Sequence, residues 1–263
     1  MNARRLVLWV AVGLLGLGGA LLLGGKLWAD DLIAEITART GAPLHMEAPM
    51  AYVSDPRITG TAPGPIKGKV ALNALRTALA AYPDPLLQQV APKLLIAGEL
   101  RLAGYRVGGT IQPGMVLLAS DYLLRDAGPS YTRRAFHHEF SSLLIARYPF
   151  PMEAWQAHIP PDIAFPLSNE AQLEATTRYI EGEALKRYYE AGFVSDYGAS
   201  SLENDINTYA ELLMDAPETL ATLAKAHPRI AAKAALIQGY YITLAPSFAK
   251  RFDPSGLPAP TFP

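Results

Sequence analysis

One segment near the N-terminus, from Leu6 to Gly25, contains no charged residue. Its 20 residues, at about 1.5 Å each in a helix, would span roughly 30 Å, the thickness of the hydrocarbon core of a bilayer. Arg4 and Arg5 precede the segment, and the positive-inside rule then places the N-terminus in the cytoplasm. The sequence therefore predicts a single-pass membrane protein, attached through residues 6–25, whose main domain lies outside the cytoplasm, in the periplasm.

A cleaved signal peptide is the alternative interpretation of this segment. Signal peptides usually have an apolar region of about 7–15 residues followed by small residues at the cleavage site. The uncharged segment is longer, and Leu27 is too large for its position in a peptide that would end at Ala29. An uncleaved anchor is therefore favoured. Small residues at every fourth position would allow two such helices to pair weakly as a homodimer: Gly16, Ala20 and Gly24.

The rest of the chain is mildly acidic and lacks cysteine. The chain has 23 basic residues, and three of them are Arg4, Arg5 and Lys26, so the remainder has 20 basic and 24 acidic residues. This net negative charge argues against a nucleic-acid partner. Because there is no cysteine, no disulfide can form, and any metal ion must be bound by nitrogen and oxygen atoms.

Composition divides the chain into four parts: an anchor at residues 1–28, a connector at 29–67, a main domain at 68–250 and a tail at 251–263. Residues 48–67 are rich in proline and glycine and show no apolar periodicity, so we expect an extended connector there. The proline-rich tail is expected to be frayed.

Within the main domain, apolar periodicity predicts a mostly helical fold with one small sheet. Pro83 and Pro85 are expected to end the first helix. Strands are expected over 94–102 and 115–119, with Gly108-Gly109-Thr110 as a turn or bulge, beside a helix that starts near Ser130. The expected helices cover residues 69–81, 130–148, 169–191, 201–214 and 228–243.

Residues 136–144 read Phe-His-His-Glu-Phe-Ser-Ser-Leu-Leu, one residue away from the pattern H-E-x-x-H. In that pattern, two histidines four residues apart on one helix face bind a zinc ion, and the glutamate acts as general base on a zinc-bound water. His138 and Glu139 occupy the first two positions. Ser142 stands where the second histidine is required, and a neutral hydroxyl is a poor zinc ligand.

The order of these segments resembles gluzincin-type zinc metallopeptidases, in particular the lethal-factor-like catalytic domains, over about residues 68–250. The resemblance implies a zincin-like α+β fold in which an edge strand lies over the cleft. It is carried by the two predicted strands with Gly108-Gly109-Thr110 between them, the His138-Glu139 helix, Asp196-Tyr197-Gly198 and Tyr209-Ala210-Glu211.

The resemblance also implies roles for individual residues. His138 matches the first zinc ligand, Glu139 the general base, and Tyr197 the tyrosine that assists at the reacting carbonyl. Glu211 matches a carboxylate that orients a ligand histidine. If the protein is an active peptidase, zinc is the implied cofactor and a peptide or protein is the implied substrate.

Two ligand positions depart from the family pattern. Ser142 stands for the second histidine and Asn207 for the ligand glutamate, so the metal site is expected to be altered or degenerate. Ser142 is expected to face Glu211 or Asn207 across the cleft. Glu203, Asn207 and Glu211 share one helix face, so a shift of one turn could offer Glu203 or Glu211 to the metal. His137 points about 100° away from His138 and would not readily join it.

Two functions stay open on these residues. The first is a membrane-anchored zinc-metallopeptidase-like protein with an altered metal site. The second is a non-catalytic protein on the same fold, a pseudoenzyme, that binds an extended peptide by strand addition or takes part in an envelope complex. Glu203 also has a structural explanation, since it lies three residues after Ser200 in a possible capping box.

Overall fold

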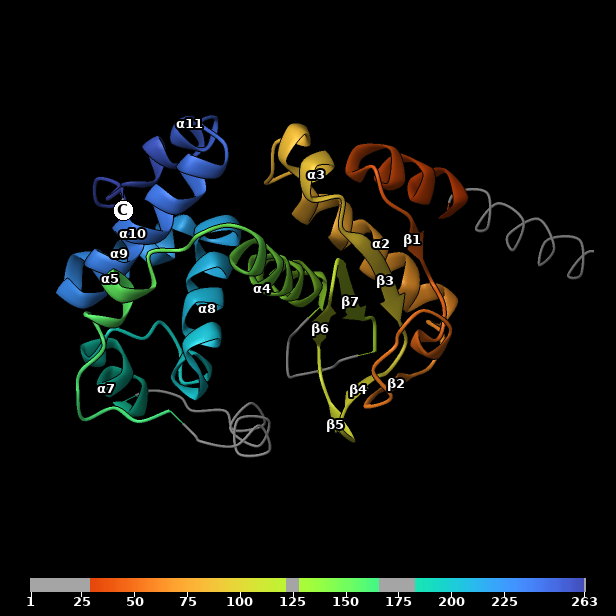
Figure 1. Cartoon of the computed structure of the whole chain (residues 1–263), viewed down its shortest axis with the longest axis horizontal. Helices are drawn as coiled ribbons and strands as arrows, with labels where there is room; N and C mark the ends of the chain where they lie inside the picture. Colours follow the sequence, from red (N-terminus) through yellow and green to blue (C-terminus); the bar gives the residue numbers. More distant parts are fainter. Residues whose placement is uncertain (1–28, 122–127, 166–182, 263) are drawn as a thin grey trace, which may run out of the picture.

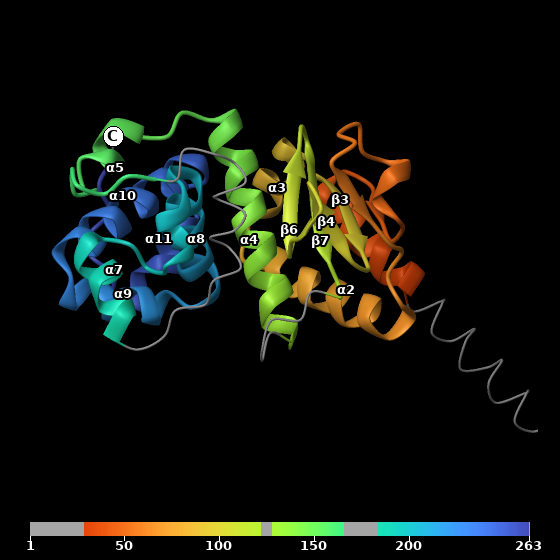
Figure 2. The ribbon, with the colours of Figure 1, turned by 90° about the horizontal axis from the view of Figure 1, so that it is seen from below.

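Two lobes flank one long helix, α4 (Gly128–Arg147), in the computed structural model (Figures 1 and 2). The structure describes residues 29–121, 128–165 and 183–262. One lobe contains the strands with α2 (Pro65–Leu79) and α3 (Asp84–Val90). The other is helical. Its elements are α5 (Met152–Gln156), α7 (Glu183–Ala191), α8 (Leu202–Asp215), α9 (Pro217–Ala226), α10 (Pro228–Leu244), α11 (Phe248–Phe252) and the short 3-10 helices η2 (Tyr197–Ser200) and η3 (Asp253–Ser255).

The larger sheet has four strands in the order β1-β3-β7-β6. The three strands β1 (Leu44–His45), β3 (Lys93–Ala97) and β7 (Met115–Ala119) are parallel, and β6 (Gly109–Gln112) pairs antiparallel with β7 at the edge. All of β7 and most of β3 are buried, as is usual for strands that are covered on both faces.

A second, antiparallel sheet covers one side of these strands. It consists of β2 (Ile58–Gly60), β4 (Leu100–Leu102) and β5 (Tyr105–Arg106). Along β3, Leu95 packs with this sheet, and its neighbour Ile96 packs into the main core with the helices. The alternation of side chains along a strand therefore gives β3 one face in each core.

Helix α4 divides its faces between the two lobes. Phe136 and Phe140 are fully buried in the main core, which they share with α2 and the sheet. His138 and Ser142 lie four residues apart, about half a turn away from these rings, and face α8. The local pattern of apolar and polar residues therefore places the motif side chains at the junction of the lobes.

The mostly helical α+β prediction agrees with the structure, but several expected elements differ. The expected strand at 94–102 is two strands, β3 and β4, because the chain turns at Gly98, where an added Cβ would lie 2.5 Å from the Ala62 carbonyl oxygen. Within the segment 108–110, Gly109 and Thr110 are the first two residues of strand β6. The tight turn comes after β6, at Gly114, which has φ +72°.

Two proline-containing regions hold more regular structure than the sequence predicts. Pro83 and Pro85 do separate α2 from α3, but Pro85 lies in the first turn of α3, a position that suits proline. The expected connector also has structure. Residues 29–40 are helical, η1 (Pro49–Ala51) comes after β1, and β2 lies inside the expected extended region.

The expected frayed tail instead packs on α10. Phe252 is buried, and the Thr261 amide donates to the Ala235 carbonyl at 2.9 Å. Of the helix expected over 169–191, residues 183–191 form α7 and the part before 183 lies outside the described residues. The predicted anchor also lies outside them. Within the described ranges, no helix has the length and apolarity needed to cross a membrane.

Candidate functional site at the interface of α4 and α8

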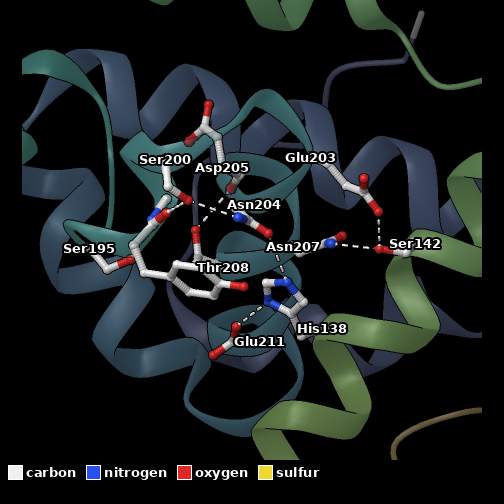
Figure 3. Close-up of polar contacts among 12 residues, drawn as sticks. His138, Ser142, Ser195, Ser200, Glu203, Asn204, Asp205, Asn207, Thr208 and Glu211 are labelled. Atoms are coloured by element: carbon white, nitrogen blue, oxygen red, sulfur yellow. Dashed lines mark hydrogen bonds and ion pairs between the residues drawn. The ribbon is translucent and has the colours of Figure 1, made fainter. Parts of the chain in front are cut away.

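The candidate site lies where α4 faces the first three turns of α8 (Figure 3). Ser201 caps α8: its hydroxyl accepts a hydrogen bond from the backbone N–H of Asn204 at 3.0 Å. The predicted capping box of Ser200 and Glu203 is therefore wrong by one residue. The cap sets the helix in a register that turns one face toward α4. This face carries Glu203, Asn204, Asn207 and Glu211.

Both ring nitrogens of His138 contact oxygen atoms. Its Nδ1 lies 2.6 Å from Glu211 Oε1, and its Nε2 lies 3.2 Å from Asn204 Oδ1. The ring also stacks on Tyr197, with 5.3 Å between the centroids and 13° between the planes. The side chain is only 7% exposed. His138 is therefore held on three sides by residues of η2 and α8.

A chain of hydrogen bonds fixes the protonation of His138. The Ser200 hydroxyl donates to the Tyr197 carbonyl at 2.6 Å, so it accepts the bond from the Asn204 amide nitrogen at 2.8 Å. The Asn204 side chain must then turn its oxygen toward His138, and this Nε2 has to carry a proton. Because Glu211 accepts at Nδ1, His138 is a doubly protonated imidazolium.

The electrostatics agree with this assignment. Burial lowers the pKa of His138, but the hydrogen bond to Glu211 and the charge of that carboxylate outweigh burial and raise the pKa to about 9. At neutral pH the pair of His138 and Glu211 is therefore an ion pair. A ring with both nitrogens protonated has no lone pair to offer a metal ion.

Ser142 is bound on both sides by α8. Its hydroxyl donates to Glu203 Oε1 at 2.5 Å and accepts from the Asn207 amide nitrogen at 2.7 Å. The predicted contact between Ser142 and Asn207 is confirmed. Asn207 is 1% exposed, and its Oδ1 has no hydrogen-bond partner. The two residues at the departed ligand positions thus bond to each other.

Glu139 lies on the side of α4 that faces the edge strand β6. A Cβ added to Gly109 would lie 2.7 Å from Glu139 Cγ, so the absence of a side chain at Gly109 is what leaves room for the glutamate. Burial raises the pKa of Glu139 to about 7, with Glu203 and Glu211 adding to the rise and His138 opposing it.

The other predicted histidine, His137, belongs to a different part of the core. Its Nδ1 lies 3.0 Å from the Tyr82 hydroxyl, and it is 1% exposed. Burial lowers the pKa of His137 to about 3, so the ring is neutral. As the angle between adjacent helix residues predicted, His137 does not join His138 at the site.

Sequence reasoning missed Asn204, although it forms the contact that decides the state of His138. A signal for it was present. Asn204 and Glu211 are seven residues apart, two helical turns, and so share the face that the motif helix contacts. Ser200 was considered only as a helix cap, and its bond to Asn204 could not be foreseen from that role.

These residues do not fit a zinc ion. The five predicted ligand positions come together at the α4–α8 interface, but they are joined by hydrogen bonds to one another and to Asn204. Within residues 29–121, 128–165 and 183–262, no three histidine, cysteine or acidic side chains are grouped so that they could hold a metal ion. A catalytic zinc requires three protein ligands, and His138 is the only strong one at the predicted positions of α4.

Comparison with protein-family models and with curated proteins found no match to the chain. Among solved structures, it is similar to a "putative zinc-binding metallo-peptidase" from Bacteroides caccae, with a TM-score of 0.54 and 19% sequence identity. The similarity covers 88% of this chain and 93% of the other. At this identity the comparison concerns the fold alone. The chain therefore has a metallopeptidase-like α+β fold.

Proposed function

We propose that this protein is a non-catalytic form of the metallopeptidase-like fold that binds an extended polypeptide segment along β6. The observation that carries this proposal is the state of His138. Its two ring nitrogens lie 2.6 Å from Glu211 Oε1 and 3.2 Å from Asn204 Oδ1, so a metal ion would have to displace one of these contacts together with its proton. A hydrogen-bonded network thus takes the positions that a metal centre would need.

The edge strand supports the binding part of the proposal. Strand β6 is last in the sheet order and pairs only with β7 among the described strands. The Ala119 amide donates to the Gly108 carbonyl, so in an antiparallel ladder residues 108, 110 and 112 bond to β7. The backbone groups of Gly109 and Ile111 then point away from β7. A bound chain can pair with such groups by strand addition.

A zinc metallopeptidase with an unconventional site is the second candidate, and one observation favours it. Glu139 stands beside β6 with its pKa raised to about 7, which suits a general base at neutral pH. The fold comparison with a protein named for zinc binding is consistent with it. Measuring the zinc content of the purified protein distinguishes the non-catalytic binding protein from the zinc metallopeptidase.

We also propose that residues 6–25 anchor the protein in a membrane with the main domain in the periplasm. The support is the uncharged segment and the two arginines before it. The protein should then stay in the membrane fraction at full length, and the main domain should be digested only by protease added outside the cytoplasm. Recovery of a soluble form that begins near residue 30 would establish the signal-peptide alternative instead.

The first test of function is elemental analysis of the purified full chain in detergent, after incubation with excess zinc and desalting. We expect far less than one zinc per chain and no cleavage of a mixed peptide library. Stoichiometric zinc together with cleavage that Glu139→Gln abolishes would establish the peptidase and overturn the non-catalytic proposal.

The second test concerns β6. Peptides selected from a display library should bind, and methylation of alternate backbone nitrogens in the peptide should abolish binding. Ile111→Pro removes one outward amide without removing a bond to β7, and it should weaken binding at least tenfold. Ile111→Val, which keeps that amide, is the matched control. Equal binding by Ile111→Pro and Ile111→Val would exclude strand addition at β6.

A further inference from the structure

We propose that the first turns of α2 form a membrane-contacting surface in which Ile66 and Val70 insert into the interface of the bilayer. This inference rests on the proposed anchoring through residues 6–25. It goes beyond that anchoring because it assigns lipid contact to a part of the folded domain, and so predicts how the domain is oriented on the membrane.

Two large apolar side chains are exposed on one face of α2. Ile66 is 79% exposed and Val70 is 42% exposed. They are four residues apart and therefore adjacent on the helix surface. The opposite face is in the main core, with Leu72, Leu75 and Leu79 fully buried. A single exposed apolar residue is ordinary, but an adjacent pair at the start of a helix forms a small apolar stripe.

Lysines lie on both sides of this stripe. At about 100° per residue, Lys67 and Lys69 project to either side of the line from Ile66 to Val70. Lys67 Nζ lies 3.4 Å from Asp121 Oδ1, and both side chains are partly exposed. Helix α2 contains no acidic residue. Apolar residues flanked by lysines are typical of helices at a membrane surface, where the lysine stems reach toward the headgroups.

The fold holds the start of α2 close to the end of the predicted anchor. The helix at residues 29–40 packs beside α2, with Glu35 Oε2 4.0 Å from Arg76 Nη1 on α2, and Arg39 Nη2 donating to the Tyr82 carbonyl at 3.1 Å just after α2 ends. Arg39, four residues after Glu35, thus meets the chain that follows the end of α2, so the 29–40 helix and α2 run in the same direction. Ala29 comes six residues before Glu35, and Val70 comes six residues before Arg76. Ala29 and Val70 are therefore level with each other along the two helices.

The tether between the uncharged segment and this helix is short. Four steps along the chain join Gly25 to Ala29, and a fully extended chain covers at most about 3.6 Å per residue, roughly 14 Å in all. The first turn of the 29–40 helix and the start of α2 lie at the same end of the molecule (Figure 2). If residues 6–25 span a bilayer, Ile66 and Val70 are therefore held near its surface.

The charges near this end cancel, which identifies the kind of contact. Lys67 and Lys69 at the start of α2 are opposed by three acidic residues: Asp30 and Asp31 of the neighbouring helix, and Asp121, which contacts Lys67. Attraction to anionic lipid is therefore weak, and burial of apolar side chains is the main contribution. The partner that fits this surface is the headgroup and acyl boundary of a bilayer, including one made of zwitterionic lipid alone.

The absence of cysteine makes a clean test possible. The full chain carrying Ile66→Cys is spin-labelled and reconstituted in phosphatidylcholine nanodiscs, and collisions of the label with oxygen and with a water-soluble nickel chelate are measured. The matched control is Phe262→Cys, an exposed apolar position (54%) in the tail, next to Thr261, which bonds to α10. Helix α10 is in the opposite lobe from α2 (Figure 1). We expect a severalfold higher ratio of oxygen to nickel collisions at residue 66 than at residue 262, with Val70→Cys intermediate.

Each other outcome overturns the inference in a recognisable way. If the chain stays in the nanodiscs but residues 66 and 70 meet the nickel chelate as often as residue 262 does, the surface is wrong and the anchor stands. If the chain does not stay in the nanodiscs, the anchor and the surface both fail. Peptide binding along β6 is measured separately, on the same labelled chains, so its failure is distinguishable from either.

Discussion

Helix α8 carries two buried polar networks on opposite faces, and they differ in how completely they are closed to solvent. On one face, Asp205 pairs with Lys233 of α10 at 2.7 Å, and both side chains are 0% exposed. On the other face, Glu211 pairs with His138 at 2.6 Å, but Glu211 is 19% exposed and Glu203 is exposed. The closed network fixes α8 in place, and the open one leaves its two carboxylates partly accessible to solvent.

The closed network has the features of a structural device. Lys233 also donates to the Gly192 carbonyl at 2.9 Å, and the Trp155 indole donates to Asp205 at 2.8 Å. The Lys233 ammonium lies 4.6 Å from the ring centroid of Phe193. Such a pair, desolvated on all sides, ties α10, α5 and the turn before η2 to α8. The position of the site residues therefore depends on a network that takes no part in the site.

The largest predicted effect comes from rebuilding a metal site on the open face of α8. Ser142→His with Asn207→Glu would restore the two departed ligands beside His138. Complete structural zinc sites are worth about 10–16 kcal/mol, so zinc binding should strengthen by several kcal/mol once His138 gives up its bond to Asn204. A competition titration with a chromophoric chelator measures this.

Wild type and Ser142→His alone are the controls for that titration. Both should bind zinc weakly, because neither has three ligands. Equal weak binding by the double variant would mean that Ser142 and Asn207 do not occupy ligand positions. Tight binding by the wild type would instead favour the zinc-peptidase candidate.

Breaking the closed network should have the next largest effect. Lys233→Met removes the ammonium and leaves Asp205 buried without a counter-charge, which typically costs about 3–5 kcal/mol. Urea denaturation followed by circular dichroism would show this loss in the free energy of unfolding. Lys225→Met, at an exposed position on α9, is the matched control and should change stability little. A loss below about 1 kcal/mol for Lys233→Met would contradict the structural role of the pair.

The open network was more predictable from sequence than the closed one. The motif and its resemblance predicted that Ser142 would face Glu211 or Asn207, and the structure pairs it with Asn207. Asp205 and Lys233 have no such signal. They are on separate helices, and in the sequence they look like ordinary surface residues. Only the folded structure buries them and brings them together as an ion pair. The protonation of His138 could not be predicted either, because it depends on the hydrogen bond by which Ser200 orients the side-chain amide of Asn204.

Folding signals were similarly uneven. Continuous apolar runs identified β3 and β7, which are buried on both faces. The half-buried edge strand β6 has no such run. Its start was predicted as part of a turn or bulge at 108–110, whereas Gly109 lies in the strand and leaves room for Glu139. Pro83 and Pro85 follow the end of the first helix as predicted, but the next helix, which has Pro85 in its first turn, was not predicted. The local sequence therefore predicted fully buried strands better than a strand whose residues are set by contact with another element.

The pH dependence of stability measures how much the ion pair of His138 and Glu211 on the open face contributes. The pKa of His138 rises from 6.5 to about 9 on folding, so its protonation contributes stability that is complete below pH 6.5 and is lost as the pH rises through 9. At about 1.36 kcal/mol per pKa unit, the loss is about 3 kcal/mol. Chemical denaturation at several pH values would measure it. His138→Gln should flatten the slope between pH 6.5 and 9, and a slope unchanged in that variant would assign it to other groups.

The smallest predicted effect concerns the centre of the open network. Ser142→Ala removes the acceptor of the Asn207 amide, whose other polar atom already has no partner, and should cost about 1–3 kcal/mol. Glu203 loses a donor too, but it is exposed and can bind water. Replacing both members of a buried hydrogen bond by apolar groups is often nearly neutral. Ser142→Ala combined with Asn207→Leu should therefore recover most of the lost stability in urea denaturation. If the double variant is no more stable than Ser142→Ala, the cost comes from lost packing between α4 and α8, and the network contributes less than its geometry indicates.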